Sequence, residues 1–376
     1  MRVGIDATVL HGCFSGVENA VRGLLVGLGE VDRATEYVLF CGRGVPLPDP
    51  LPPNFRWHCL PFPAASRTRR ILFQQVELPR LARRLGLQVL HGPAYVTPIA
   101  RTVPTIASIY DLMVYLYPAL CAASNRLHYR SVLSRSAPRC HRVVVPSHAV
   151  ARSVEDVLGI VRERVVVAHL GIDARFVPPR RDIDPQAERK RLGLPDRYLL
   201  YVGNIEPKKG LDTLCRALAV ARRDLGLSVP LVIAGKRAWG LAGLDTLIHE
   251  LGLRDAVLFT GYVPAEELPL VYGLADAFVF PSVYEGFGLP PLEAMACGAP
   301  VIASDAGALP EVTGDAVLRV PSGDVRALAD AMWRLCEDRD LRACLSARGT
   351  RQAARFSWRN HAELVHNVYA EVADGA

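Results

Sequence analysis

Thirteen short apolar runs rich in β-branched residues recur along the chain, and stretches with helical periodicity separate most of them. Apolar strands that alternate with helices are typical of parallel sheets covered on both faces. The pattern therefore predicts an α/β fold. The expected strands are 3–7, 37–42, 55–60, 87–92, 104–110, 142–147, 164–169, 198–203, 230–235, 256–261, 277–282, 300–304 and 316–320. The first seven alternate with expected helices that include 17–29, 70–85, 124–137 and 148–158.

The strands fall into two series, and 376 residues exceed what one hydrophobic core usually organises. The segment VPPRRDIDPQAERK (177–190) is rich in proline and charge and lies between the two series, so it is the expected linker. We expect two Rossmann-like, doubly wound domains, residues 1–180 and 190–356, that face each other across a cleft.

Composition limits the class of protein. No apolar run reaches the roughly 18 residues of a membrane span, and the N-terminus lacks a basic segment followed by a long apolar one. The nine cysteines are odd in number and none forms a CxxC pair, which favours reduced thiols over disulfides or zinc ligands. A cytoplasmic protein is expected.

Positive charge gathers in the first half of the chain. Residues 1–185 contain 23 Lys and Arg against 14 Asp and Glu, with arginines at positions 67, 69, 70, 80, 83 and 84. Such a face attracts an anionic acceptor or an anionic membrane surface, and the second case predicts peripheral contact at the inner membrane face. A solvated, arginine-rich helix explains the same pattern equally well.

The stretch EGFGLPPLE (285–293) joins an expected strand to an expected helix, PLEAMACG, in whose first turn Glu293 falls. Glycines permit close approach of the backbone to a ligand, and the N-terminus of a helix favours an anion. Glu285 and Glu293 suit hydroxyl groups, because a carboxylate accepts two charge-assisted hydrogen bonds from a diol. A turn residue and a carboxylate that complements the helix dipole are the alternative interpretations.

The stretch YVGNIEPKKGLDTL (201–214) places Lys208 and Lys209 before another expected helix. Cations are disfavoured at that end of a helix, so a bound anion is expected to compensate them. Only four lysines occur in the chain, which makes the pair conspicuous. The loop that contains Gly12 and Gly16 is a weaker anion-binding signal, and no cluster of metal ligands is evident.

Together these residues resemble family 4 glycosyltransferases, retaining enzymes of the GT-B fold. The resemblance rests on the spacing of Glu285 and Glu293, on GNIEPKKG and on VVVPSHAVARSV. It also rests on FSWRNHAELVHNVY, which is similar to the tryptophan-bearing last helix of that family. It implies that this helix, about 357–376, packs back on the N-terminal domain. The stretches GIDATVL, SGVENAVRGLL and GNIEPKKG are most similar to those of bacterial mannosyl- and hexosyltransferases that build surface polysaccharides or glycosylated natural products.

The resemblance also implies roles. Glu285 is expected to contact the transferred sugar, Glu293 the ribose, and Lys209, helped by Lys208, the departing diphosphate. The expected donor-binding set is Gly16, Gly203, Asn204, Lys208, Lys209, Gly286, Phe287, Gly288, Leu289 and Glu293. No cofactor, no metal and no nucleic-acid partner are expected.

Two positions depart from the family pattern. Tyr110 stands where many members have histidine before an aspartate, here Asp111. Tyr110, Asp111 or, on the acceptor side, His91 is expected to take over part of that role. Asn204 stands where many members have arginine.

The expected reaction is transfer of a hexose from a nucleotide-diphosphate sugar, GDP-mannose first and a UDP-sugar next, to a glycan, lipid-linked or natural-product hydroxyl. A GT-B epimerase or phosphorylase, and a non-catalytic sugar-nucleotide binding module, are the alternatives. The sequence does not identify the acceptor.

Overall fold

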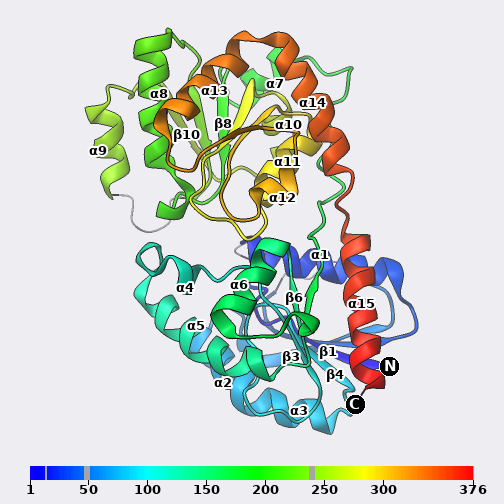
Figure 1. The fold of residues 1–376 in the computed structure, drawn as a ribbon. Coiled ribbons are helices and arrows are strands. Elements are labelled where there is room, and N and C mark those ends of the chain that lie inside the picture. The colour runs from blue at the N-terminus through cyan, green and yellow to red at the C-terminus, as the bar shows by residue number, and fades with distance from the viewer. Residues whose placement is uncertain (13–14, 46–50, 237–241, 376) are drawn as a thin grey trace. The chain divides into compact units, whose positions relative to one another are not determined.

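The computed structural model describes residues 1–12, 15–45, 51–236 and 242–375. Contacts divide the chain into two compact units: unit 1 is Met1–Gly171 with Phe356–Ala376, and unit 2 is Ile172–Arg355. Each unit is an α/β layer structure around one parallel sheet (Figure 1).

The sheet of unit 1 has seven strands in the order β3-β2-β1-β4-β5-β6-β7. They are β1 (Arg2–Asp6), β2 (Glu36–Arg43), β3 (Phe55–Pro63), β4 (Val89–Gly92), β5 (Thr105–Ser108), β6 (Arg142–Val145) and β7 (Val165–Val167). All seven expected strands of this half are confirmed. The helices are α1 (Gly16–Val31), α2 (Arg67–Leu72), α3 (Leu78–Arg84), α4 (Met113–Leu116), α5 (Ala123–Ser136), α6 (His148–Leu158) and α15 (Trp358–Asp374).

The expected helix 70–85 is not continuous. It begins at Arg67 and is interrupted by a π-helical turn, Phe73–Glu77, before α3. Pro79 lies at the start of α3 and has no N–H to donate to the preceding turn, so the regular hydrogen-bond pattern breaks there. Because of the interruption, α2 is a separate short helix that carries Arg67 and Arg70.

The last helix, α15, packs against α1 within unit 1 (Figure 1). Its Trp358 fills space that glycines leave open. A Cβ atom at Gly23 would lie 2.1 Å from the indole ring, and a Cβ atom at Gly171 would lie 2.0 Å from the backbone nitrogen of Trp358. Val365 and Tyr369 continue the contact into the core beneath β1. Side chains larger than glycine at these two positions would prevent this seating of the helix.

The sheet of unit 2 has six parallel strands in the order β10-β9-β8-β11-β12-β13. They are β8 (Leu199–Val202), β9 (Leu231–Ala234), β10 (Val257–Gly261), β11 (Ala277–Phe280), β12 (Val301–Ser304) and β13 (Leu318–Val320), so the six expected strands are also confirmed. The helices are α7 (Pro185–Arg191), α8 (Leu211–Leu225), α9 (Ala242–Glu250), α10 (Leu268–Gly273), α11 (Leu289–Ala296), α12 (Leu309–Thr313), α13 (Val325–Glu337) and α14 (Arg339–Ala353).

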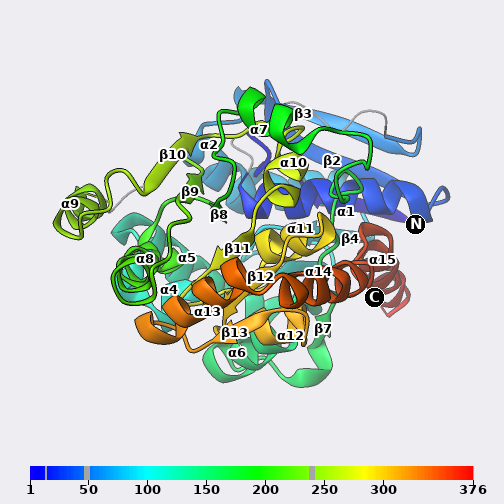
Figure 2. The ribbon, with the colours of Figure 1, turned by 90° about the horizontal axis from the view of Figure 1, so that it is seen from above.

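Helices cover both faces of this sheet. Right-handed crossovers place α8 and α9 on one face and α10, α11 and α12 on the other, because the chain moves in opposite directions along the sheet. Helix α13 contacts α8 and so joins the first group, as Figure 2 shows. The doubly wound arrangement puts the carboxyl ends of all six strands at one edge.

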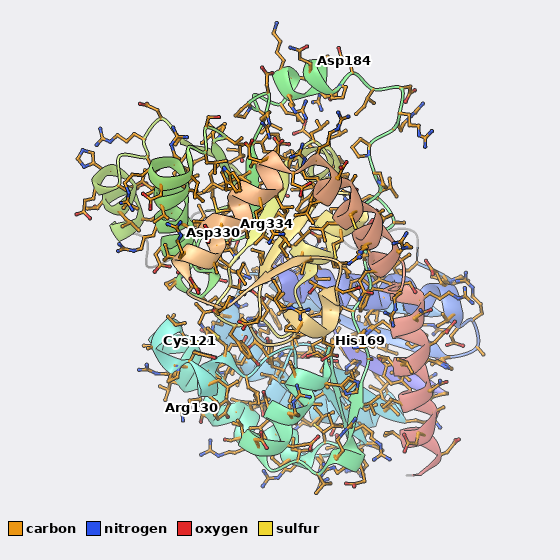
Figure 3. The ribbon with its side chains drawn as sticks, turned by 45° about the horizontal axis from the view of Figure 1, so that its top comes forward. Cys121, Arg130, His169, Asp184, Asp330 and Arg334 are labelled. Atoms are coloured by element: carbon orange, nitrogen blue, oxygen red, sulfur yellow. The ribbon has the colours of Figure 1, made fainter. Side chains whose placement is uncertain are left out.

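The segment expected to be a linker, 177–190, belongs to unit 2 instead. Asp184, labelled in Figure 3, caps α7 by accepting a hydrogen bond from the Gln186 nitrogen at 2.9 Å. The guanidinium of Arg189 then donates to the Leu274 carbonyl at 2.9 Å. The charges that suggested a solvated linker thus cap a helix and attach it to α10.

Candidate active site

The strand order of unit 2 reverses between the neighbours β8 and β11. In doubly wound sheets a ligand site forms at the carboxyl ends of the strands at such a reversal. The segment after β8 carries Lys208 and Lys209 in a 3-10 turn, and the segment after β11 carries Glu285. The topology therefore joins two of the motifs singled out in the sequence.

Lys209 and Glu285 form a direct ion pair. The Lys209 Nζ donates to Glu285 Oε1 at 2.6 Å, and each side chain is only 11% exposed. The same Nζ lies 5.1 Å from the centroid of the Phe280 ring, whose face attracts a cation. The lysine expected to bind phosphate and the carboxylate expected to bind sugar thus neutralise each other in this structure.

Glu285 stays ionised despite its burial. Burial alone raises the pKa of this carboxyl group, but the charges of Lys209 and Lys208 and hydrogen bonds from Lys209 and Ser282 outweigh it, so the pKa lies below its usual value. The Ser282 hydroxyl donates to Oε1 at 2.8 Å. Ser282 was not singled out in the sequence, where it is one of many serines at a strand end.

Two glycines hold the backbone on either side of the ion pair. Gly210 follows Lys209 at φ 67°, and a Cβ atom there would lie 2.2 Å from the Pro281 carbonyl oxygen. Gly307 has φ 58°, and a Cβ atom there would lie 2.2 Å from the Glu285 carbonyl oxygen. Neither position accepts a larger residue without moving the loop that carries the lysine or the glutamate.

Replacement of Gly210 with alanine is therefore expected to lower the free energy of unfolding of unit 2 by more than about 2 kcal/mol, because strain and a backbone clash add. Gly226 is a matched control: its φ is 70°, but nothing lies within 4 Å of a Cβ atom there. Gly226→Ala should cost about 1 kcal/mol. Urea unfolding measures the free energy of unfolding of both variants. Equal decreases would show that the contact with Pro281 adds nothing to the strain of the backbone.

The other residues expected in the lysine loop lie close by in the chain. Gly203 follows β8, and its N–H donates to the Ala234 carbonyl at 3.0 Å. The carbonyl of Asn204 accepts a hydrogen bond from the Tyr201 hydroxyl at 3.0 Å, while its side chain is exposed. The Lys208 Nζ lies 3.7 Å from Glu206 Oε1, so its charge is partly compensated at long range.

Helix α11 begins earlier than expected. It starts at Leu289, with Gly288 at the N-cap and φ 105°, so Glu293 lies in the second turn and not in the first. The earlier start weakens the interpretation of Glu293 as a partner of the helix dipole. The next two residues are prolines, which leaves Leu289 as the only N–H donor among the first three helical positions. Gly286 and Phe287, which precede the helix, are buried.

Glu293 accepts a hydrogen bond from the Tyr272 hydroxyl at 2.9 Å. Burial and the nearby charge of Asp173 raise its pKa to about 7, although the bond from Tyr272 and the charge of Arg175 act in the opposite direction. The two glutamates of the motif thus differ: Glu285 is firmly ionised, and Glu293 exchanges its proton near neutrality. Tyr272 comes from α10, far from any motif in the sequence, so sequence reasoning missed it.

Four expected residues lie in unit 1: Gly16, His91, Tyr110 and Asp111. Gly16 is the exposed first residue of α1, and nothing lies within 4 Å of a Cβ atom there. Tyr110 and Asp111 follow β5; burial raises the pKa of the Tyr110 hydroxyl, and a hydrogen bond with Ser108 opposes the rise. Asp111 Oδ1 accepts from the Met113 nitrogen at 3.1 Å.

His91 is a core residue. It is fully buried, its Nδ1 lies 2.6 Å from the Tyr369 hydroxyl, and its Nε2 lies 2.8 Å from Ser108 Oγ. Burial lowers its pKa to about 3, so the ring is neutral at physiological pH. Because both ring nitrogens are engaged inside unit 1, the structure is at odds with an acceptor-side role for His91.

Two family patterns match the chain. "Glycosyltransferase Family 4" covers residues 14–176, and "Glycosyl transferases group 1" covers residues 182–352. Across residues 1–12, 15–45, 51–236 and 242–375, no three His, Cys, Asp or Glu side chains lie close enough together to hold a metal ion.

Two relatives from Escherichia coli show the same family. The O-antigen chain mannosyltransferase B is 31% identical over 283 residues, which are 75% of this chain and 74% of that protein. The serotype-specific mannosyltransferase WbdA is 34% identical over 286 residues, 73% of this chain, but the match spans only 34% of that longer protein.

A solved structure has the same fold. Alr3699/HepE from Anabaena, crystallised in complex with UDP-glucose, aligns with a TM-score of 0.75 over 99% of this chain and 100% of its own, at 17% identity. With the family patterns, the mannosyltransferase relatives and the two doubly wound units described above, the chain belongs to the family 4 glycosyltransferases and has the GT-B fold.

Proposed function

We propose that this glycosyltransferase moves a hexose from a nucleotide-diphosphate sugar to a hydroxyl group, with retention of the anomeric configuration. The observation that carries the proposal is the buried pair of Lys209 and Glu285 at the strand reversal of unit 2. GDP-mannose is the favoured donor, because the E. coli relatives are mannosyltransferases. A UDP-sugar is second, because the Anabaena structure holds UDP-glucose.

The leaving group gains negative charge as the bond from the sugar C1 to the diphosphate breaks. Lys209 and Lys208 stabilise this charge, and the Leu289 N–H supports a phosphate oxygen. The acceptor oxygen bonds to C1 on the same face, and its proton passes to the released phosphate oxygen. In this proposal the lysines supply the positive charge and no metal is required.

The two glutamates hold the hydroxyl groups on either side of the diphosphate. Glu285 faces the transferred sugar once Lys209 turns toward phosphate, and Glu293 faces the ribose. Both roles use the ability of a carboxylate to accept two hydrogen bonds. Gly203, Asn204 and the 286–288 loop complete the donor site of unit 2.

Binding of the nucleotide-sugar is expected to weaken as the pH falls below the pKa of Glu293, about 7. Only the ionised carboxylate accepts both ribose hydrogen bonds, so affinity should fall by up to about tenfold per pH unit and level off above about pH 8. Isothermal titration with an intact nucleotide-sugar, whose diphosphate does not titrate in this range, measures the effect. Glu293→Gln should abolish the slope, whereas Glu250→Gln, an exposed control, should retain it.

Thermal-shift titration with GDP, UDP, ADP and dTDP tests the donor class, because a ligand of the folded state stabilises it by RT ln(1 + [L]/Kd). Early-time proton NMR of the product tests retention. A GT-B epimerase would change the donor alone, a phosphorylase would require phosphate as the acceptor, and a binding module would bind without turnover. No stabilisation by any nucleotide diphosphate would refute the proposal.

The acceptor is a glycan, a lipid-linked sugar or a small molecule, and we propose peripheral contact of unit 1 with an anionic membrane at its cytoplasmic face. Leu72 and Val76, 56% and 40% exposed, lie just before α3 and its exposed arginines, a combination that suits a lipid surface. No helix in the described ranges is long and apolar enough to span a bilayer. Co-sedimentation with anionic but not zwitterionic vesicles tests the contact.

A further inference from the structure

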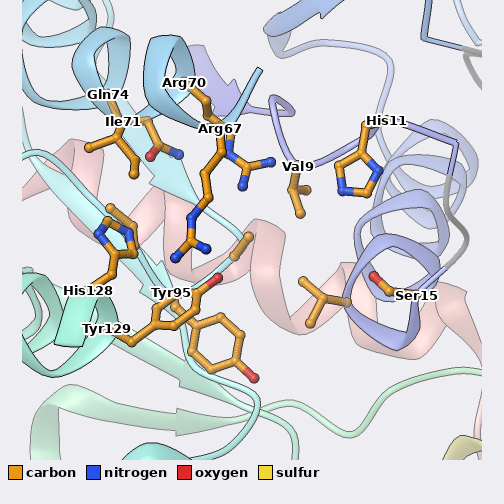
Figure 4. A pocket seen from close by; sticks show the side chains of 13 residues that line it. Val9, His11, Ser15, Arg67, Arg70, Ile71, Gln74, Tyr95, His128 and Tyr129 are labelled. Atoms are coloured by element: carbon orange, nitrogen blue, oxygen red, sulfur yellow. The ribbon is translucent and has the colours of Figure 1, made fainter. Parts of the chain in front are cut away.

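Unit 1 has a pocket of its own at the point where its strand order reverses, between β1 and β4. Residues that follow β1, such as His11, and residues that follow β4, such as Tyr95, form two of its walls. Helix α2 and helix α5 supply the others (Figure 4). This is the place where a doubly wound sheet binds a ligand, and every residue that lines the pocket belongs to unit 1.

Two arginines point into this pocket. Arg67 and Arg70 lie one turn apart on α2, and Figure 4 shows both guanidinium groups directed toward the space between α2, α5 and the loop after β1. Both are half-buried, whereas Arg69 on the same helix is exposed. In the described part of the chain, no salt bridge joins either guanidinium to a carboxylate, so their charges reinforce each other.

Asp6, a carboxyl group on which the charge of Arg70 acts, already has other hydrogen-bond partners. Its Oδ1 accepts from the Thr8 nitrogen and hydroxyl at 3.1 and 2.6 Å, and its Oδ2 accepts from Gln74 Nε2 at 2.7 Å. Burial raises the pKa of Asp6, while the bonds from Thr8 and Gln74 and the charge of Arg70 act against the rise. Neutral donors therefore saturate this carboxyl group, and Arg70 is attracted to it only at a distance.

Histidines surround the arginines. The side chain of His128 reaches the pocket from α5, and burial followed by the charges of Arg67 and Arg70 lowers its pKa. His11 lines the other side, 3.8 Å from Glu18, which also pairs with Arg22 at 3.0 Å. Burial and the positive charges of the two arginines thus act in the same direction on His128, and a bound anion would oppose both.

The wall also contains a strained residue. Tyr95 has φ 68°, the sole positive φ outside glycine in the parts of the chain that the structure describes, at a cost of about 1–2 kcal/mol. In this conformation its ring packs against Tyr129 at 5.4 Å and Tyr110 at 5.8 Å between centroids. Strain that persists in a pocket wall is typical of a ligand site.

We propose that this pocket binds a phosphate group of the acceptor, with Arg67 and Arg70 as its ligands and His128 as a further donor. Guanidinium groups match phosphate oxygens with paired hydrogen bonds, and a bound phosphate relieves the repulsion between the two arginines. This proposal rests on the proposed transfer, and it narrows the acceptor to a phosphate ester. The ester is either a soluble sugar phosphate or a polyprenyl-diphosphate-linked sugar.

Three acceptors separate the possibilities: a methyl hexoside, a hexose 6-phosphate and a polyprenyl-diphosphate-linked hexose. We expect transfer to one or both phosphate esters, and R67Q with R70Q should lower kcat/KM for that ester by at least about 100-fold. R69Q is the matched control and should change it less than about twofold. Transfer to the neutral hexoside with equal efficiency, or no response to the double variant, would overturn the proposal.

Donor binding distinguishes a failure here from a failure of the proposed function. The double variant should keep the thermal shift of the wild-type protein with the nucleotide diphosphate, because its changes lie in unit 1. If the wild type binds no nucleotide diphosphate, the proposed function fails. If it binds and transfers but ignores acceptor phosphate, only the further inference fails.

A measurement on the unaltered protein tests the proposal even if the double variant does not fold. Inorganic phosphate should raise the pKa of His128 in proton NMR titrations and should inhibit transfer competitively with the acceptor. Arg69→Gln should leave both effects intact. An unchanged His128 titration at saturating phosphate, or inhibition competitive only with the donor, would count against the pocket as a phosphate site.

Discussion

Lys209→Met should lower kcat/KM for sugar transfer by about 100- to 1000-fold, the loss typical when one group that stabilises a developing anion is removed. Lys209 is the buried cation at the strand reversal of unit 2, with its Nζ 2.6 Å from Glu285. The methionine keeps most of the side-chain volume but offers no charge to the departing diphosphate. Affinity for the nucleotide diphosphate should fall together with the rate.

The same change has a cost in the free protein, because it leaves Glu285 buried without its partner. Removal of one member of a buried pair costs about 3–5 kcal/mol, unless the carboxyl group takes up a proton. The pKa of Glu285 should therefore rise in the variant. Stability measured against pH separates the two effects, because the lost stability should return as the pH falls and Glu285 is neutralised.

Lys190→Met is the matched control. Lys190 is an exposed lysine at the end of α7 in the same unit. Its replacement should change neither kcat/KM nor nucleotide affinity beyond about twofold. A loss of less than about tenfold for Lys209→Met, after the fraction of folded protein has been confirmed, would contradict the leaving-group role.

The positions of all thirteen strands could be predicted from the sequence, because parallel strands buried on both faces form continuous apolar runs. The π-helical turn at Phe73–Glu77 was harder to foresee, since it lies inside the segment 70–85 that was expected to be one helix. The linker prediction failed for a different reason. Proline and charge mark both flexible segments and short capped helices, and only the contacts of Arg189 with α10 distinguish them.

Only part of the candidate site could be predicted from the sequence. Glu285, Glu293 and Lys209 belong to local motifs, but the ion pair between residues 76 positions apart follows from the strand order. Tyr272 and Gly307 have no local signal, since each matters through one contact with a glutamate of the site. For His91 the sequence suggested a site residue where the structure has a core residue. A histidine at the end of an apolar strand has the same sequence context in both cases, and only its burial beside Tyr369 distinguishes them.

Glu285→Gln should separate binding from catalysis. Glutamine has nearly the same shape and still accepts a hydrogen bond from Ser282, but it no longer neutralises Lys209. In the wild type a diphosphate must compete with Glu285 for the lysine. In the variant the lysine is available at once, so affinity for the nucleotide diphosphate should be unchanged or higher.

Transfer should nevertheless become about 100-fold slower or more, because the hydroxyl groups of the sugar lose their charged acceptor as C1 becomes cationic. Titration calorimetry with the nucleotide diphosphate and initial rates under saturating donor measure the two quantities separately. Glu250→Gln should alter neither. Weaker binding with an unchanged kcat would assign Glu285 to the diphosphate instead of the sugar. The contrast with Lys209→Met, in which affinity and rate fall together, follows from the ion pair itself: the two residues pair with each other in this structure and are proposed to bind different parts of the donor.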